Sequence, residues 1–165
     1  IPEVEIRRTE NLVVVSPDKG GTVRAVAYAN RLKTEGIAIV YKERDINRKN
    51  HSDALDMIGD VEGKNILIVD DIVDSAGTII SASKLLNRRG ATSITVAATH
   101  GLFSGEALER LTDSPIEELL VTDTIAHREK VVAHPKIKIV SIAKLLAECV
   151  ERIQSGQSIS KGLIL

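Results

Sequence analysis

The sequence predicts an α/β protein with a parallel sheet of about five strands flanked by helices. Short β-branched runs alternate with helical patterns along the 165 residues, an order that implies right-handed crossovers between parallel strands. Aromatic residues make up only 2% of the chain, so the core must consist mainly of Ile, Leu, Val and Ala. That composition is typical of a parallel sheet buried on both faces. We therefore expect a single domain, residues 1–165, large enough to bury a substantial core.

The candidate strands are short runs rich in branched apolar residues. The run Asn65–Val69 is a good example, because it is apolar after its first residue and is followed directly by acidic residues. In chain order the candidate strands are Leu12–Ser16, Ile37–Tyr41, Asn65–Asp70, Ser93–Thr99, Glu118–Thr122 and Lys138–Ser141.

Helical patterns separate or follow these runs. The helical pattern that starts at Thr78 stops at Gly90, and glycine commonly terminates helices. The candidate helices are Gly21–Glu35, Ser52–Ile58, Thr78–Arg89, Gly105–Leu111 and Ile142–Ile153.

Polar or glycine-rich residues follow each of the first four candidate strands. Ligands of parallel α/β sheets bind beyond the carboxyl ends of the strands, so these four segments are expected to face one crevice. They are Ser16–Gly21, Lys42–Asp45, Asp70–Asp71 and Thr99–Gly101.

The segment Val69–Ile79, VDDIVDSAGTI, places three carboxylates beside the start of a helix. One interpretation is an ordinary acidic turn in which Asp74 or Ser75 caps the helix. A second is a receiver domain whose strand-end carboxylates hold magnesium. In a third, residues 74–78 bind a phosphate at the helix N-terminus, while the preceding carboxylates accept hydrogen bonds from vicinal sugar hydroxyls. The third interpretation predicts a phosphorylated ribose bound by Asp70, Asp71, Asp74, Ser75, Ala76, Gly77 and Thr78.

This segment resembles the phosphoribosyl-diphosphate loop of type I phosphoribosyltransferases and of ribose-phosphate diphosphokinases. Ser75 stands where those families more often have threonine, and it keeps the hydroxyl. Two further segments, Val13–Gly21 with Arg24 shortly after it and Ala98–Gly105, resemble the diphosphokinases. The resemblance extends from about Leu12 to Ser160 and corresponds to the C-terminal half of a ribose-phosphate diphosphokinase, also called phosphoribosyl pyrophosphate synthetase. It implies a type I phosphoribosyltransferase-like fold.

The resemblance implies a reaction in which ATP and ribose 5-phosphate give 5-phosphoribosyl 1-diphosphate and AMP. Asp18 would help to carry Mg²⁺, the implied cofactor. Lys42 and Arg44 match a catalytic Lys-x-Arg pair that follows the second strand in this family. Without the resemblance, the charged run from Lys42 to Lys49 would be interpreted as a solvated loop. We assign no catalytic role to His100, for which a structural histidine that caps a strand is an open alternative.

The same family places its ATP-binding motifs in an N-terminal half that this sequence does not contain. We therefore expect the chain to bind ribose 5-phosphate but to make no product from ATP by itself. Members of the family form dimers and hexamers, so a homo-oligomer is expected.

The C-terminal segment, residues 142–165, is expected to pack either on such an N-terminal half or on a neighbouring chain. Its apolar residues recur at helical spacing and form one stripe. An alternative is that the stripe packs on the domain's own sheet. The stripe consists of Ile142, Leu145, Leu146, Cys149, Val150 and Ile153.

Other functions are less consistent with the sequence. A phosphoribosyltransferase would need a nucleobase-recognising hood, which we do not locate, and a non-catalytic regulatory subunit of the synthetase would lack the Lys-x-Arg pair or the intact loop. A receiver domain would not need Ala76-Gly77-Thr78. A net charge of −1 without a basic stripe argues against nucleic acid, and no apolar run approaches the roughly 20 residues of a membrane span. The single cysteine, Cys149, makes a cytoplasmic location the expectation.

Overall fold

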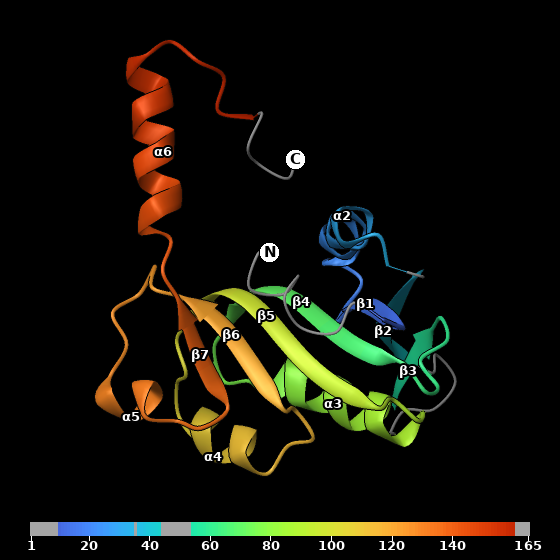
Figure 1. Ribbon diagram of the computed structural model, residues 1–165. Helices are drawn as coiled ribbons and strands as arrows, with labels where there is room; N and C mark the ends of the chain where they lie inside the picture. The colour runs from blue at the N-terminus through green and yellow to red at the C-terminus, as the bar shows by residue number, and fades with distance from the viewer. Residues whose placement is uncertain (1–9, 35, 44–53, 161–165) are drawn as a thin grey trace.

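A seven-stranded sheet forms the centre of the computed structural model, which describes residues 10–34, 36–43 and 54–160 (Figure 1). The strand order is β3-β2-β1-β4-β5-β6-β7. All neighbouring strands are parallel except β2 and β3, which form an antiparallel pair at one edge. The strands are β1 Leu12–Ser16, β2 Gly36–Glu43, β3 Ala54–Ile58, β4 Asn65–Val73, β5 Ser93–Gly101, β6 Glu118–Thr122 and β7 Ile137–Val140.

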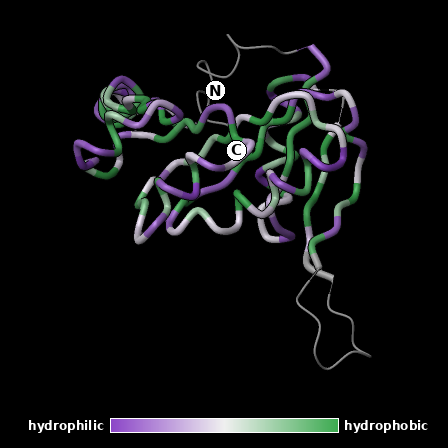
Figure 2. Tube along the Cα trace, turned by 90° about the horizontal axis from the view of Figure 1, so that it is seen from below, coloured by the Kyte–Doolittle hydropathy of each residue, from purple (hydrophilic) through white to green (hydrophobic). Residues whose placement is uncertain are grey.

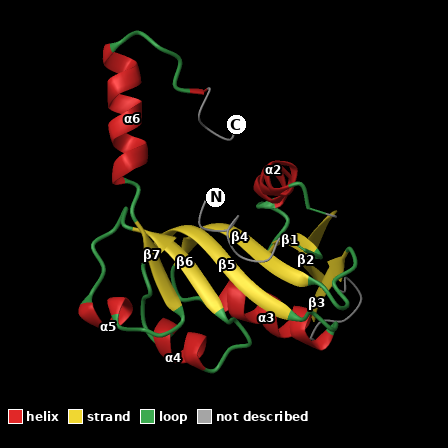
Figure 3. Cartoon of the chain, viewed as in Figure 1, coloured by secondary structure: helices red, strands yellow, loops and turns green. Residues whose placement is uncertain are grey.

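Helices lie on both faces of the sheet, as Figures 1 and 3 show. Helices α3, α4 and α5 lie on one face, and α2 lies on the other over β1 and β4. Helix α6 extends away from the sheet. The helices are α2 Thr22–Leu32, α3 Gly77–Arg88, α4 Ala107–Thr112, α5 Glu129–Val132 and α6 Ala143–Gln154. None of the helices within the described ranges is long and apolar enough to cross a membrane.

Strand β4 shows why the sheet has an apolar core on each side. Its residues Ile66 and Ile68 belong to the cluster that includes α3, whereas Leu67 and Val69 pack in the cluster that includes α2. All four are at most 1% exposed. Because successive strand residues point to opposite faces, a continuous apolar run is what a strand covered on both sides requires. The expected α/β sheet buried on both faces is therefore confirmed.

The expected helix Ser52–Ile58 is wrong for its described part, because Ala54–Ile58 is the edge strand β3. Leu55 and Met57 pack partly buried against the core, whereas Ile58 is 63% exposed. This alternation has the period of a strand, but a segment this short fits a helical pattern as well. Antiparallel pairing with β2, in which Val40 lies opposite Met57, supplies the backbone hydrogen bonds that decide between the two.

Helix α6 presents the C-terminal apolar stripe to solvent. None of its residues is buried, and Leu145, Leu146, Val150 and Ile153 are 44–62% exposed. Figure 2, which views this helix along its axis, shows hydrophobic and hydrophilic residues side by side on it. The alternative in which the stripe packs on the domain's own sheet is therefore wrong. A packing partner elsewhere remains a prediction.

Candidate functional site

A pocket with a volume of about 260 Å³ opens at the carboxyl ends of β1 and β4. It is lined by Asp18, from the loop after β1, and by residues 70–79, which run from the end of β4 into the first turn of α3. The structure thus brings together the predicted metal residue and every predicted ribose 5-phosphate residue. Strand β4 continues to Val73 rather than ending at Asp70 as expected, so the first two carboxylates lie within the strand.

The turn from β4 into α3 leaves the helix N-terminus free of a side-chain cap. Ala76 is the N-cap residue, with a left-handed φ of 62°, and it makes no side-chain capping hydrogen bond. Asp74 instead accepts a hydrogen bond from the hydroxyl of Ser104. The interpretation in which Asp74 or Ser75 caps the helix is therefore wrong. Backbone N–H groups that follow a left-handed residue at a helix start form a concave anion site.

The end of β5 and the loop after it support this turn. The backbone N–H groups of Leu102 and Ser104 donate to the carbonyls of Val73 and Asp74, at 2.8 and 3.1 Å. Phe103 is 1% exposed and anchors the loop in the core, and its carbonyl accepts a hydrogen bond from Arg128. The Ala98–Gly105 segment therefore holds the turn from β4 into α3 in place.

Gly101 is required for the close packing of Phe103. A Cβ at this position would lie 2.5 Å from the Phe103 ring, so Gly101→Ala forces the ring and its loop to shift. We expect the free energy of unfolding to fall by about 1–3 kcal/mol, the usual cost of overpacking a core, as measured by urea denaturation. The matched control is Gly36→Ala, where a Cβ would meet nothing within 4 Å. Equal stabilities of the two variants would contradict this account of the loop.

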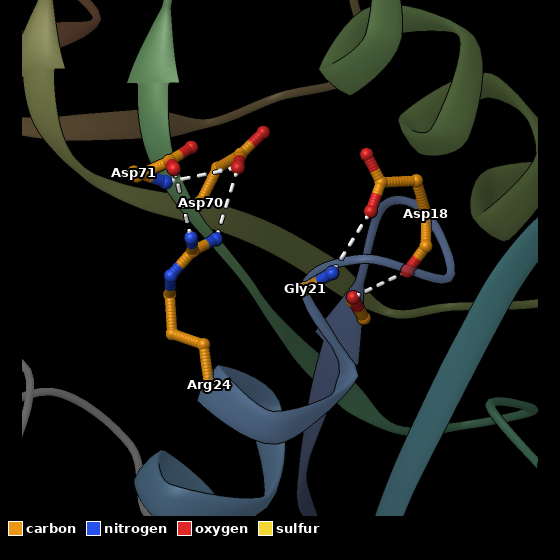
Figure 4. A network of polar contacts seen from close by, with 6 residues as sticks. Asp18, Gly21, Arg24, Asp70 and Asp71 are labelled. Carbon is orange, nitrogen blue, oxygen red and sulfur yellow. Dashed lines mark hydrogen bonds and ion pairs between the residues drawn. The ribbon is translucent and has the colours of Figure 1, made fainter. Parts of the chain in front are cut away.

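Arg24, near the start of α2, bridges Asp70 and Asp71 (Figure 4). Its two terminal nitrogens lie 3.0 Å from Asp70 Oδ1 and 3.0 Å from Asp71 Oδ2. Burial raises the pKa of Asp70, and the side-chain hydrogen bond with Asp70 lowers the pKa of Asp71. The charge of Arg24 is a smaller influence, which partly offsets the rise in the pKa of Asp70 and adds to the fall in the pKa of Asp71. Sequence reasoning noted Arg24 only as part of a motif and missed this contact, which joins residues 46 positions apart.

The Asp18 loop is held by its own hydrogen bonds. Asp18 Oδ1 accepts from the Gly21 backbone N–H at 2.9 Å, and the Asp18 carbonyl accepts from the Ser16 hydroxyl at 2.6 Å. The carboxylate lines the same pocket as Asp70 and Asp71, but within the described part of the chain no three acidic, His or Cys side chains come together in a group that could hold a metal ion by themselves. Mg²⁺ prefers oxygen ligands and is usually held by one or two carboxylates together with substrate phosphates. The donor chemistry of this pocket therefore fits Mg²⁺.

The predicted catalytic pair lies at the edge of the described structure. Lys42 is within β2, where its backbone lies opposite Leu55 of β3, and Arg44 lies outside the described residues. The Lys19 ammonium group is 5.4 Å from the centre of the Tyr41 ring. This contact ties the loop that carries Asp18 to the strand that carries Lys42. The catalytic assignment itself remains a prediction.

His100, near the end of β5, contacts a neighbouring loop. Its Nδ1 lies 2.8 Å from the Thr124 hydroxyl, which also donates to the Thr99 carbonyl. His100 does not line the pocket at Asp18 and residues 70–79. The sequence assigned His100 no role, and in the structure its ring contacts Thr124 outside the pocket.

The mostly parallel sheet and the helices that flank it define an α/β domain of the phosphoribosyltransferase type. A solved adenine phosphoribosyltransferase shares the fold, with a TM-score of 0.54 and 20% sequence identity over 69% of each chain. Residues 45–163 match the family model described as the phosphoribosyl synthetase-associated domain. The chain belongs to this family.

Two curated relatives and a solved structure support this assignment. The ribose-phosphate pyrophosphokinase of Aquifex aeolicus is 48% identical over 151 residues, which are 92% of this chain and 47% of that protein. Ribose-phosphate pyrophosphokinase A of Dictyostelium discoideum is 43% identical over 90% of this chain and 46% of that protein. A solved phosphoribosylpyrophosphate synthetase from Mycobacterium smegmatis has a TM-score of 0.83 and 33% identity, over 94% of this chain and 49% of its own. The resemblance predicted from the sequence is confirmed. The chain spans about half the length of the curated relatives it matches.

Proposed function

We propose that this chain carries the ribose 5-phosphate site of a ribose-phosphate diphosphokinase. In the proposed reaction the 1-hydroxyl oxygen of ribose 5-phosphate attacks the β-phosphorus of ATP. The bond between the α- and β-phosphates breaks, which gives 5-phosphoribosyl 1-diphosphate and AMP. Transfers of this kind depend mainly on positioning and on neutralising charge. The proposal rests on the resemblance to the named relatives together with the geometry of the pocket.

The observation that carries the proposal is that one pocket holds two kinds of binding group. The uncapped turn at residues 74–78 is suited to a phosphate, and the carboxylates of Asp70 and Asp71 are suited to sugar hydroxyls. A volume of about 260 Å³ suits a ligand smaller than the molecules that fill pockets of roughly 300–1,000 Å³. Ribose 5-phosphate carries both matching groups on one small molecule.

Each pocket residue then has a defined task. Residues 74–78 bind the 5-phosphate through backbone N–H groups and hydroxyls, and Asp70 and Asp71 accept hydrogen bonds from the 2- and 3-hydroxyls. Asp18 helps to hold Mg²⁺, which when bound supplies positive charge beside the phosphates. Lys42, near the end of β2, and Arg44 neutralise charge on the transferring phosphates. A cytoplasmic location suits this chemistry, because both substrates are phosphorylated metabolites.

Calorimetric titration of the chain with ribose 5-phosphate in the presence of Mg²⁺ tests the proposal. We expect saturable binding of ribose 5-phosphate and little binding of ribose, which lacks the phosphate. Similar heats for both sugars, or no saturable heat for either, would contradict the proposed site. The alternative of a type I phosphoribosyltransferase predicts release of diphosphate when 5-phosphoribosyl 1-diphosphate and a nucleobase are supplied.

We further propose that the exposed stripe on α6 forms a contact with another chain or domain. Large exposed apolar patches usually mark interaction sites. The chain is therefore expected to self-associate at tens of micromolar in sedimentation velocity, and Leu146→Glu with Val150→Glu should yield a monomer. The control is Lys144→Glu, which adds the same negative charge to the same helix at an exposed position. A monomeric wild type would rule out self-association through α6.

A further inference from the structure

Arg24 holds two carboxylates that are adjacent in sequence but differ in exposure. The side chain of Asp70 is 15% exposed and that of Asp71 is 62% exposed, yet each gives one oxygen to the same guanidinium group at 3.0 Å. Successive residues of a regular strand point to opposite faces. In Figure 4 both carboxylates nevertheless turn toward the guanidinium group. The contact with Arg24 therefore accompanies an orientation of the two carboxylates that regular strand geometry alone would not favour.

The guanidinium group is presented by a rigid part of the molecule. Helix α2 is fixed by Ala25, Ala29 and Leu32, which are at most 9% exposed. At the start of the same helix, a Cβ at Gly21 would lie 2.6 Å from the Ser16 hydroxyl and 3.5 Å from Arg24 Nη1. The loop backbone thus passes close to the arginine.

The contact contributes little to stability but has a clear use at the site. Partly exposed ion pairs are typically worth only about 0–1 kcal/mol, and buried apolar residues already anchor the helix. An ionised carboxylate offers a hydroxyl only acceptor oxygens, and two neighbouring carboxylates repel each other. The guanidinium group is always charged and has a planar fork that can contact both. It contacts one oxygen of each carboxylate, Oδ1 of Asp70 and Oδ2 of Asp71.

We propose that Arg24 is a positioning residue that holds the carboxylates of Asp70 and Asp71 oriented to accept the sugar hydroxyls of the ligand. This inference rests on the proposed ribose 5-phosphate site. It adds Arg24 as a residue that determines the preference of that site for ribose 5-phosphate over a deoxy sugar phosphate. Arg24 acts through the two carboxylates and does not contact the phosphate. The phosphate lies at residues 74–78, and Arg24 is not among the residues that line the pocket.

Titration with two sugars separates hydroxyl recognition from phosphate binding. The wild-type chain should bind ribose 5-phosphate about tenfold or more tightly than 2-deoxyribose 5-phosphate, because the deoxy sugar lacks a hydrogen bond to a charged acceptor. In Arg24→Met the affinity for ribose 5-phosphate should fall by about tenfold, and that for the deoxy sugar should fall less. The preference for the ribose form should then drop to about threefold or less. Arg24→Lys keeps the charge but not the planar fork, so an intermediate preference is expected.

The control is Arg31→Met, which removes the same charge from the same helix about two turns further on and should leave the preference unchanged. If Arg24→Met fails to fold, the preference measured for Arg24→Lys decides the question. An unchanged preference in the Arg24 variants, with both sugars weakened equally, would overturn the positioning role and leave the proposed function standing. A wild-type chain that binds neither sugar phosphate would overturn the proposed function and this inference with it.

Discussion

Gly77→Val is expected to abolish ribose 5-phosphate binding, with a loss of at least about 100-fold in affinity. Gly77 is the first residue of α3 and lines the pocket. A Cβ there would meet only the Ser75 hydroxyl oxygen, at 3.7 Å, so the protein has room for a side chain. The space that valine would fill is the space where a phosphate approaches the backbone. Losing two hydrogen bonds to a charged phosphate, at roughly 1.5–3 kcal/mol each, corresponds to a decrease in affinity of at least about 100-fold.

Calorimetry of the folded variant measures this loss. The matched control is Gly36→Val in β2, where an added Cβ would meet nothing within 4 Å and where a β-branched residue suits the strand. This control should bind as the wild type does. Because neither substitution introduces a close contact through its Cβ, both chains are expected to fold, and a difference in affinity reports the site. Unchanged affinity in Gly77→Val would place the ligand elsewhere.

The local parts of the site could be predicted from the sequence. The run at Asn65–Val69 signals a doubly buried strand, and Asp74–Thr78 signals a turn into a helix, because both signals are carried by neighbouring residues. The helix at Ser52–Ile58 was predicted wrongly for a related reason. Its described part, Ala54–Ile58, is too short for periodicity to distinguish a helix from a strand. The strand is decided by antiparallel pairing with β2, which lies outside the segment itself.

The contacts that hold the site together could not be predicted from local patterns. Arg24 meets Asp70 across 46 residues, and Ser104 meets Asp74 across 30. Each contact depends on how two strand ends come together in the sheet. The strand order is a property of the whole fold, since β1 lies between β2 and β4. Polar strand ends predict that a crevice forms, and only the folded chain determines which side chains pair inside it.

Lys42→Ala is expected to lower kcat by on the order of 10²–10³ or more while ribose 5-phosphate affinity changes little. The reason is that a cation which neutralises charge developing only in the transition state affects turnover more than ground-state binding. Lys42 lies at the end of β2, next to Tyr41, whose ring the Lys19 side chain contacts from the Asp18 loop. This contact joins the loop that carries Asp18 to the strand that carries Lys42, near which the proposed transfer of the diphosphoryl group would occur.

The measurement requires a form of the protein that turns over ATP and ribose 5-phosphate, with kcat and KM determined separately for each substrate. Lys84→Ala removes the same charge from an exposed position on α3 and should leave both parameters close to the wild type. If Lys42→Ala keeps its kcat and only KM rises, Lys42 binds substrate in the ground state and the proposed transition-state role is wrong. If kcat falls while sugar-phosphate affinity, measured by calorimetry, stays the same, the lysine acts on the transferring phosphates and the pocket at residues 70–79 works independently of it.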